Sequence, residues 1–162
     1  MKHFLFSSLI FGFALFSLNT SIQAADEPTS FTLTKVRLLA IPGTEAELRD
    51  GRILGSLEGA TTGMVLLAEV VETPARGEWL EVVVPHARPY RYIKFVAGAG
   101  TAVRLAEIEF YSSTGKLAGR HFGTHVPNDK ADASAEKAFD GNAETYFEFP
   151  NDNSYAGLDL GG

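Results

Sequence analysis

Apolar and β-branched residues form short runs along the chain, and each run ends in residues typical of turns. Pro42-Gly43, Asp50-Gly51 and Thr114-Gly115 are examples of these breaks. Short strands at this spacing, without a long helical period, predict an all-β protein built as an antiparallel sandwich or barrel. The expected strands span residues 32–41, 52–56, 64–72, 78–84, 90–97, 103–111 and 155–160. The helix-like patch at 132–137 is too short to change this fold class.

Residues 105–111 have the most regular alternation of apolar and polar side chains. Ala106, Ile108 and Phe110 share one face of the expected strand, while Glu107 and Glu109 lie on the other. Two interpretations of these glutamates stay open. They line a solvated face, or Glu107 points to a cation that a later turn also binds. Periodicity does not decide between the two.

The N-terminal segment has the plan of a secretory signal peptide. A charged start at Lys2 precedes an apolar run over residues 4–18, a polar stretch and the small residues Ala24-Ala25. We predict cleavage after Ala24, which leaves a linker at 25–31 and one domain at 32–162. A retained membrane anchor is the alternative, but the apolar run is shorter than the ~20 residues of a spanning helix. We therefore expect a secreted or periplasmic protein without an integral membrane segment after cleavage.

Composition narrows the function classes. The net charge is −6, and nucleic acids and anionic membranes both select a basic surface, so neither is an expected partner. The chain has no cysteine, which excludes disulfides and a lipid-anchored lipoprotein. The 12 Phe and 5 Tyr residues are available to fill a core between two sheets.

The turn Asp140-Gly141-Asn142, with Thr145 shortly after it, offers several oxygen atoms at close range. Side-chain and backbone oxygens of this kind bind hard cations such as calcium. Asp-Gly-Asn is also an ordinary tight-turn sequence. The turn is therefore a candidate cation site and equally a candidate structural turn.

Several segments together resemble the discoidin, or coagulation-factor type C, family, which includes the family 32 carbohydrate-binding modules. They are residues 35–39, 55–59, 90–95, 106–111, 138–145 and 157–161. The resemblance implies a jelly-roll β-sandwich of the galactose-binding type that binds glycans without catalysing a reaction. It also implies a structural calcium ion. The implied ligands are Asp140, Asn142, Thr145, the Ala106 carbonyl and Glu107.

The order of these segments departs from the family, because its usual opening strands come last here. A circular permutation explains this order, and so does a fragment of a tandem array. The permutation predicts that the first and last strands are neighbours, with Leu158 close to Val36.

Candidate glycan contacts come from two loops. Sugar recognition in such modules uses aromatic faces with polar groups around them. The first loop contributes Phe149, Asn151, Asp152 and Asn153, and the second contributes Arg120, His121, Phe122 and His125. Solvated loops are the alternative. Trp79 alternates with Glu78 and Leu80, so we expect it to pack on a sheet.

The leading prediction is an exported, non-catalytic module that binds a glycan or a cell-surface polysaccharide. An adhesion or assembly domain that binds a protein partner is the alternative. A glycosidase that uses Glu148 and Asp152 is a remote alternative. It needs carboxylates ~5 or ~6.5–9.5 Å apart across a cleft, and a single small sandwich rarely forms such a cleft.

Overall fold

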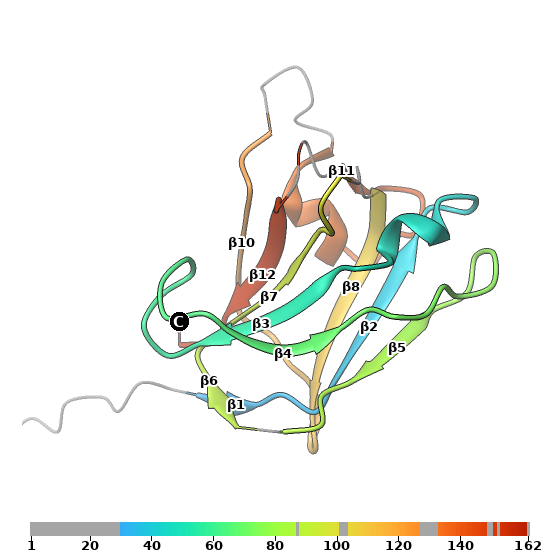
Figure 1. Ribbon diagram of the computed structural model, residues 1–162. Coiled ribbons are helices and arrows are strands. Elements are labelled where there is room, and N and C mark those ends of the chain that lie inside the picture. The colour runs from blue at the N-terminus through green and yellow to red at the C-terminus, as the bar shows by residue number, and fades with distance from the viewer. Residues whose placement is uncertain are drawn as a thin grey trace, which may run out of the picture.

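A computed structural model describes residues 30–86, 88–100, 104–126, 133–148, 151 and 153–161. Its strands form two five-stranded antiparallel sheets (Figure 1). The first, here the β7 sheet, has the order β10 (Arg120–Gly123), β12 (Tyr155–Asp159), β7 (Tyr92–Val96), β3 (Arg52–Ser56) and β4 (Val65–Glu69). The second, here the β8 sheet, has the order β11 (Phe147–Glu148), β8 (Arg104–Ser112), β2 (Lys35–Ala40) and β5 (Leu80–Val83), with β9 (Gly115–Lys116) paired to β8. The predicted all-β antiparallel sandwich is confirmed.

Alternation along the strands builds the core between the sheets. The β8 sheet contributes Leu38 and Ile108, and the β7 sheet contributes Ile93 and Phe95, all at most 1% exposed. Residues between these positions point to the outer faces, because side chains alternate along a strand. Each sheet therefore has one apolar inner face and one outer face on which functional groups can lie.

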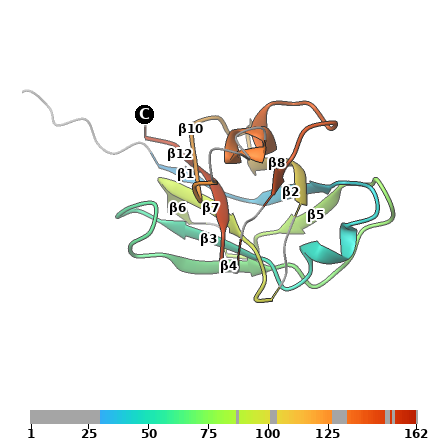
Figure 2. The same ribbon diagram turned by 90° about the horizontal axis from the view of Figure 1, so that it is seen from above.

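Short elements close the ends and one side of the sandwich. β1 (Phe31–Thr32) pairs with β6 (Pro89–Tyr90), and the 3-10 helix η1 (Glu45–Leu48) follows β2. A second 3-10 helix, η3 (Ala135–Phe139), packs against β8 and β10, and Figure 2 shows it beside these two strands. Ala138 of η3 is fully buried. η3 therefore links one edge of the β7 sheet to the β8 sheet.

The predicted strands are present with small differences at their ends, while β9, β10 and β11 were not predicted. One expectation is wrong: the first and last long strands are not neighbours. β12 pairs with β10 and β7, whereas β2 pairs with β8 and β5. Leu158 and Val36 instead enter the shared core from opposite sheets, at 3% and 0% exposed. The circular permutation itself stays a prediction.

The predicted signal peptide at residues 1–24 lies outside the described residues. Among the helices that are described, none is both long and apolar enough to cross a bilayer.

Candidate functional site

The outer face of the β7 sheet is organised around a residue without a side chain. Gly157 in β12 lies opposite Phe122 of β10 on one side and Lys94 of β7 on the other. A Cβ atom at Gly157 would collide with the Ile93 carbonyl oxygen and lie 2.6 Å from Lys94 Cβ. The close approach of β7 therefore requires glycine here, and neighbouring side chains cover the position.

Aromatic side chains from adjacent strands surround Gly157. The Phe122 ring lies between the rings of Tyr92 and Tyr155, with centroid distances of 6.3 and 6.1 Å. The Phe122–Tyr92 pair is edge-to-face, at 70°, and the Phe122–Tyr155 pair is tilted, at 58°. All three side chains are partly exposed. We call Tyr92, Phe122 and Tyr155 the aromatic platform.

A charged cluster lies at one end of the platform. Asp159, on β12 opposite Arg120, is only 3% exposed and pairs with two guanidinium groups. Arg91 Nε donates to Asp159 Oδ1 at 2.8 Å, and Arg120 Nη2 donates to Asp159 Oδ2 at 3.1 Å. The Gly161 N–H also donates to Oδ1, at 3.1 Å. The Arg91 hydrogen bond, aided by these other donors, lowers the pKa of Asp159 to about 2.

Lys94 lies on β7 opposite Gly157, beside the centre of the platform, and is 6% exposed. Its Nζ donates to the Ala60 carbonyl at 3.0 Å and lies 4.0 Å from the Tyr155 ring centroid. Burial lowers the pKa of this ammonium group. The carbonyl belongs to the β3–β4 connection, which therefore borders the platform on the side of β7.

The predicted glycan-binding residues fall at two ends of β10. Arg120 and His121 lie beside the end of β12, and the His121 ring stacks on Phe139 of η3 at 4.6 Å. His125 lies at the opposite end of β10, where it lines a cleft of about 290 Å³ next to η3. The structure therefore separates His125 from Arg120 and His121 by the length of one strand.

Asn151 and Asn153 lie in the turn that leads into β12, near His125. Thr124, the residue before His125, donates its N–H to the Tyr155 carbonyl at 2.8 Å. Both asparagines are exposed, and their Oδ1 atoms accept hydrogen bonds from Ser154 Oγ (3.0 Å) and Arg52 Nη2 (2.7 Å). Phe149 and Asp152 lie outside the described residues.

The candidate cation site brings together a buried glutamate and the Asp140 turn. Glu107 is 5% exposed, and its Oε1 atom has no hydrogen-bond partner among the residues that the structure describes. Burial, with the nearby Asp140 charge, raises the pKa of Glu107, and the backbone N–H groups of Gly141 and Asn142 oppose the rise. The solvated-face interpretation is therefore wrong for Glu107, because the Asp140 turn covers this part of β8.

The other predicted cation ligands make hydrogen bonds within the turn. Thr145 Oγ1 lies 3.0 and 2.9 Å from the two carboxylate oxygens of Asp140, and Asn142 Oδ1 accepts from the Glu144 N–H at 3.1 Å. Ala106 is fully buried on β8. Within the described residues, no group of three or more His, Asp and Glu side chains is arranged to hold a metal ion. Two carboxylates, an unpartnered oxygen and neutral oxygens nearby nevertheless fit the donor set that calcium takes.

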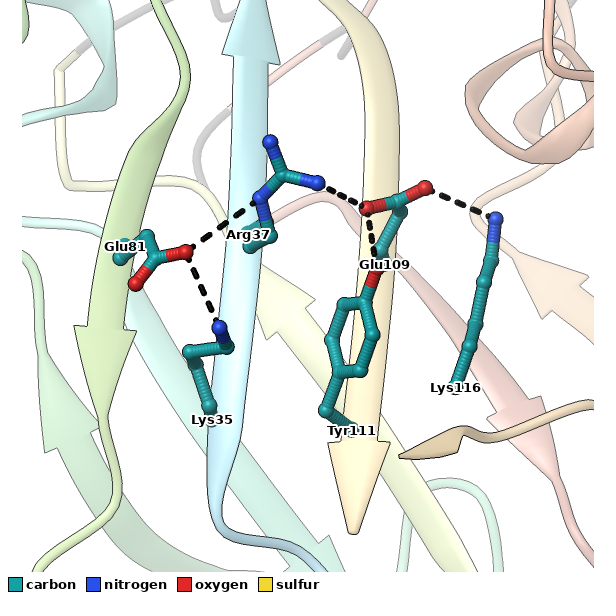
Figure 3. A network of polar contacts seen from close by, with 6 residues as sticks. All are labelled: Lys35, Arg37, Glu81, Glu109, Tyr111 and Lys116. Carbon is teal, nitrogen blue, oxygen red and sulfur yellow. Dashed lines mark hydrogen bonds and ion pairs between the residues drawn. The ribbon is translucent and has the colours of Figure 1, made fainter. Parts of the chain in front are cut away.

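The outer face of the β8 sheet carries a polar network around Glu109 (Figure 3). Glu109 accepts hydrogen bonds from Arg37 Nη1 (2.8 Å), Tyr111 OH (2.8 Å) and Lys116 Nζ (3.0 Å). The Arg37 guanidinium also lies 4.3 Å from the Trp79 ring centroid. The packing of Trp79 on a sheet, as predicted, is confirmed, because its ring lies against Arg37 of β2.

Sequence reasoning missed four residues around Gly157: Tyr92, Lys94, Tyr155 and Asp159. The pattern of residues along 92–96 and 155–159 predicted two strands. It did not predict that the four residues lie close together, because their proximity depends on the pairing of β12 with β7 and with β10.

No protein family and no curated protein matches this chain. Among solved structures, a CBM62 from Clostridium thermocellum Xyl5A is similar, with a TM-score of 0.47 and 19% sequence identity. The match covers 56% of this chain and 63% of that chain, which is less than two thirds of its length. At this level of similarity the fold rests on the strand pairing described above, and the discoidin resemblance stays a prediction.

Proposed function

We propose that this protein is an exported, non-catalytic module that binds a glycan through the aromatic platform. The observation that carries the proposal is the set of partly exposed rings from three adjacent strands, Tyr92, Phe122 and Tyr155, with charged groups beside them. Export rests on the signal peptide that the first 24 residues predict.

The chemistry of the platform suits a sugar ring. One side of a pyranose presents C–H groups that pack on aromatic rings, while its hydroxyl groups need hydrogen-bond partners at the rim. Tyrosine provides a large apolar face together with a polar hydroxyl group. The guanidinium groups of Arg91 and Arg120, which Asp159 holds in place, supply hydrogen-bond donors on the same face.

A glycan array probed with the purified mature protein tests the proposal. We expect binding to at least one class of oligosaccharide, and loss of that binding in Phe122→Ala, which removes the central ring. Thr124→Ala on the same segment is not a suitable control, because Thr124 Oγ1 accepts a hydrogen bond from the Tyr155 N–H. Val83→Ala, an exposed position on β5 of the other sheet, is the matched control. An array with no binding, or equal binding by Phe122→Ala, contradicts the proposal.

We further propose that a calcium ion occupies the site between Glu107 and the Asp140 turn in a structural role. The unpartnered Glu107 Oε1 atom supports this proposal, since a bound cation satisfies a buried carboxylate and offsets its repulsion from Asp140. Calorimetric titration with calcium, combined with thermal unfolding, tests it. We expect the wild type to bind the ion and gain thermal stability, and Asp140→Ala to do neither. The same unfolding profile with and without calcium contradicts a cation site.

An assembly domain that binds a protein partner is the second candidate. The observation that favours it is the edge strand β4, where Val65 and Leu66 are 48% and 53% exposed. Edge strands with apolar side chains pair with other chains unless they are protected. A pull-down that is abolished by Leu66→Lys, while glycans fail to bind, favours this candidate over the first.

A further inference from the structure

We infer that the aromatic platform selects acidic sugars, in which the pyranose ring carries a carboxylate. This inference rests on the proposed glycan-binding function and adds the class of ligand. It is drawn from the charges of the Asp159 cluster at one end of the platform and of Lys94 beside its centre.

The first argument concerns Arg120. Its side chain is 79% exposed, and its recorded ion pair uses a single nitrogen, Nη2, on Asp159. A guanidinium group has five N–H donors in a fixed plane and binds carboxylates with two parallel hydrogen bonds. Asp159 already accepts from Arg91, Arg120 and the Gly161 N–H. Arg120 is thus held in place by Asp159 while most of its donors face solvent beside Phe122.

The second argument concerns Lys94. No carboxylate pairs with its Nζ in the part of the chain that the structure describes, and its recorded contacts are the Ala60 carbonyl and the Tyr155 ring. A buried ammonium group without a counter-ion is costly to keep charged. The group has three N–H donors, of which one is committed to Ala60. An anionic ligand on the platform supplies the missing counter-charge.

The balance of charge on this face points the same way. Arg91, Arg120 and Lys94 surround the platform, and Asp159 is the acidic partner of the first two. The whole chain, by contrast, has a net charge of −6. A basic face on an acidic protein repels cations and attracts anions locally, although the rest of the surface does the opposite. The aromatic rings add a preference for a ring-shaped ligand over a simple linear anion.

The test compares polygalacturonate with the same polymer after methyl esterification, which removes the charge and keeps the sugar ring. Affinities are measured by calorimetry for the wild type, Arg120→Gln, Lys94→Met and the control Arg76→Gln. Arg76 is an exposed cation in the turn before β5, on the other sheet. Circular dichroism and thermal unfolding confirm that each variant is folded. Polyglutamate serves as a linear polyanion without a sugar ring.

We expect the wild type to bind the acidic polymer about tenfold more tightly than its methyl ester, which is the scale of one charge-assisted contact. Arg120→Gln and Lys94→Met should each lose most of this difference, and Arg76→Gln should keep it. Equal affinity for the two polymers, an unchanged preference in Arg120→Gln and Lys94→Met, or equally tight binding of polyglutamate overturns the inference. Binding of neutral glycans alone overturns the inference but leaves the proposed function standing. No binding to any glycan on the array contradicts both the inference and the proposed function.

Discussion

Replacement of Asp159 by asparagine tests the charged cluster at the end of the platform. The Asp159 carboxylate is 3% exposed and is held by Arg91, Arg120 and the Gly161 N–H. These donors lower its pKa from an ordinary value of 3.8 to about 2. At about 1.4 kcal/mol for each pKa unit, this difference makes the ionised carboxylate worth about 2.5 kcal/mol of folding free energy. Asp159→Asn keeps the size of the side chain and removes that contribution.

The pH dependence has a definite sign. Because the pKa of Asp159 is lower in the folded state, its contribution is complete above about pH 4 and is lost as the pH falls towards 2. Asp159→Asn should therefore unfold more easily than the wild type at pH 7 and approach it in stability near pH 2. Arg91 and Arg120 are 30% and 79% exposed, so water can solvate them in the variant. The loss should accordingly stay close to the value for the carboxylate alone.

Urea unfolding followed by the fluorescence of Trp79 measures the effect. With a typical dependence of about 1–3 kcal/mol/M, the midpoint of Asp159→Asn should fall by about 0.8–2.5 M at pH 7. Glu81→Gln is the matched control. Glu81 pairs with Lys35 at 3.0 Å but is 53% exposed, and exposed ion pairs contribute about 1 kcal/mol or less. Equal midpoints for Asp159→Asn and the wild type at pH 7, or a parallel dependence on pH, would refute the reasoning.

Other perturbations test the remaining parts of the structure. Glu107→Gln in calcium-free buffer should raise the free energy of unfolding by about 1–2 kcal/mol near neutral pH, because it removes a buried charge whose pKa is raised by burial. The wild type should lose stability as the pH rises through that pKa. A lower melting temperature for the variant would contradict this expectation. Gly157→Ala should cost about 1–3 kcal/mol, since its Cβ meets the Ile93 carbonyl, and unchanged thermal unfolding would show that β7 can move away. Glu109→Gln should cost about 1–2 kcal/mol by urea unfolding, because the carboxylate accepts from Arg37, Tyr111 and Lys116; a midpoint equal to the wild type would show that the network in Figure 3 adds little.

The sequence predicted the long strands because apolar and polar residues alternate along them. This alternation is a local pattern, since one face of each strand packs on the core. The same pattern does not specify partners. Leu158 and Val36 both read as core residues, and both are, but nothing local indicates that they lie in opposite sheets. β10 was missed for a related reason: Arg-His-Phe-Gly has no strong strand pattern and becomes a strand through its pairing with β12.

The candidate sites show the same limit. Glu107 and Glu109 occupy equivalent positions on β8, yet the Asp140 turn buries one while Arg37, Tyr111 and Lys116 bind the other. That difference depends on segments distant in the sequence. The association of Glu107 with Asp140 was nevertheless anticipated, through the resemblance to a family. Of the aromatic platform, Phe122 was among the candidate glycan contacts, but Tyr92 and Tyr155 were not, because the three rings come from β7, β10 and β12.

The most direct test of glycan binding by the outer face of the β7 sheet is a residue-resolved NMR titration with an oligogalacturonide. The account predicts that the largest amide shifts occur at Tyr92, Phe122, Gly157 and Arg120. Shifts confined to the turn around Asn151 and Asn153 would contradict binding by the outer face of the β7 sheet. A spectrum that stays unchanged at high ligand concentration would contradict the preference for acidic sugars.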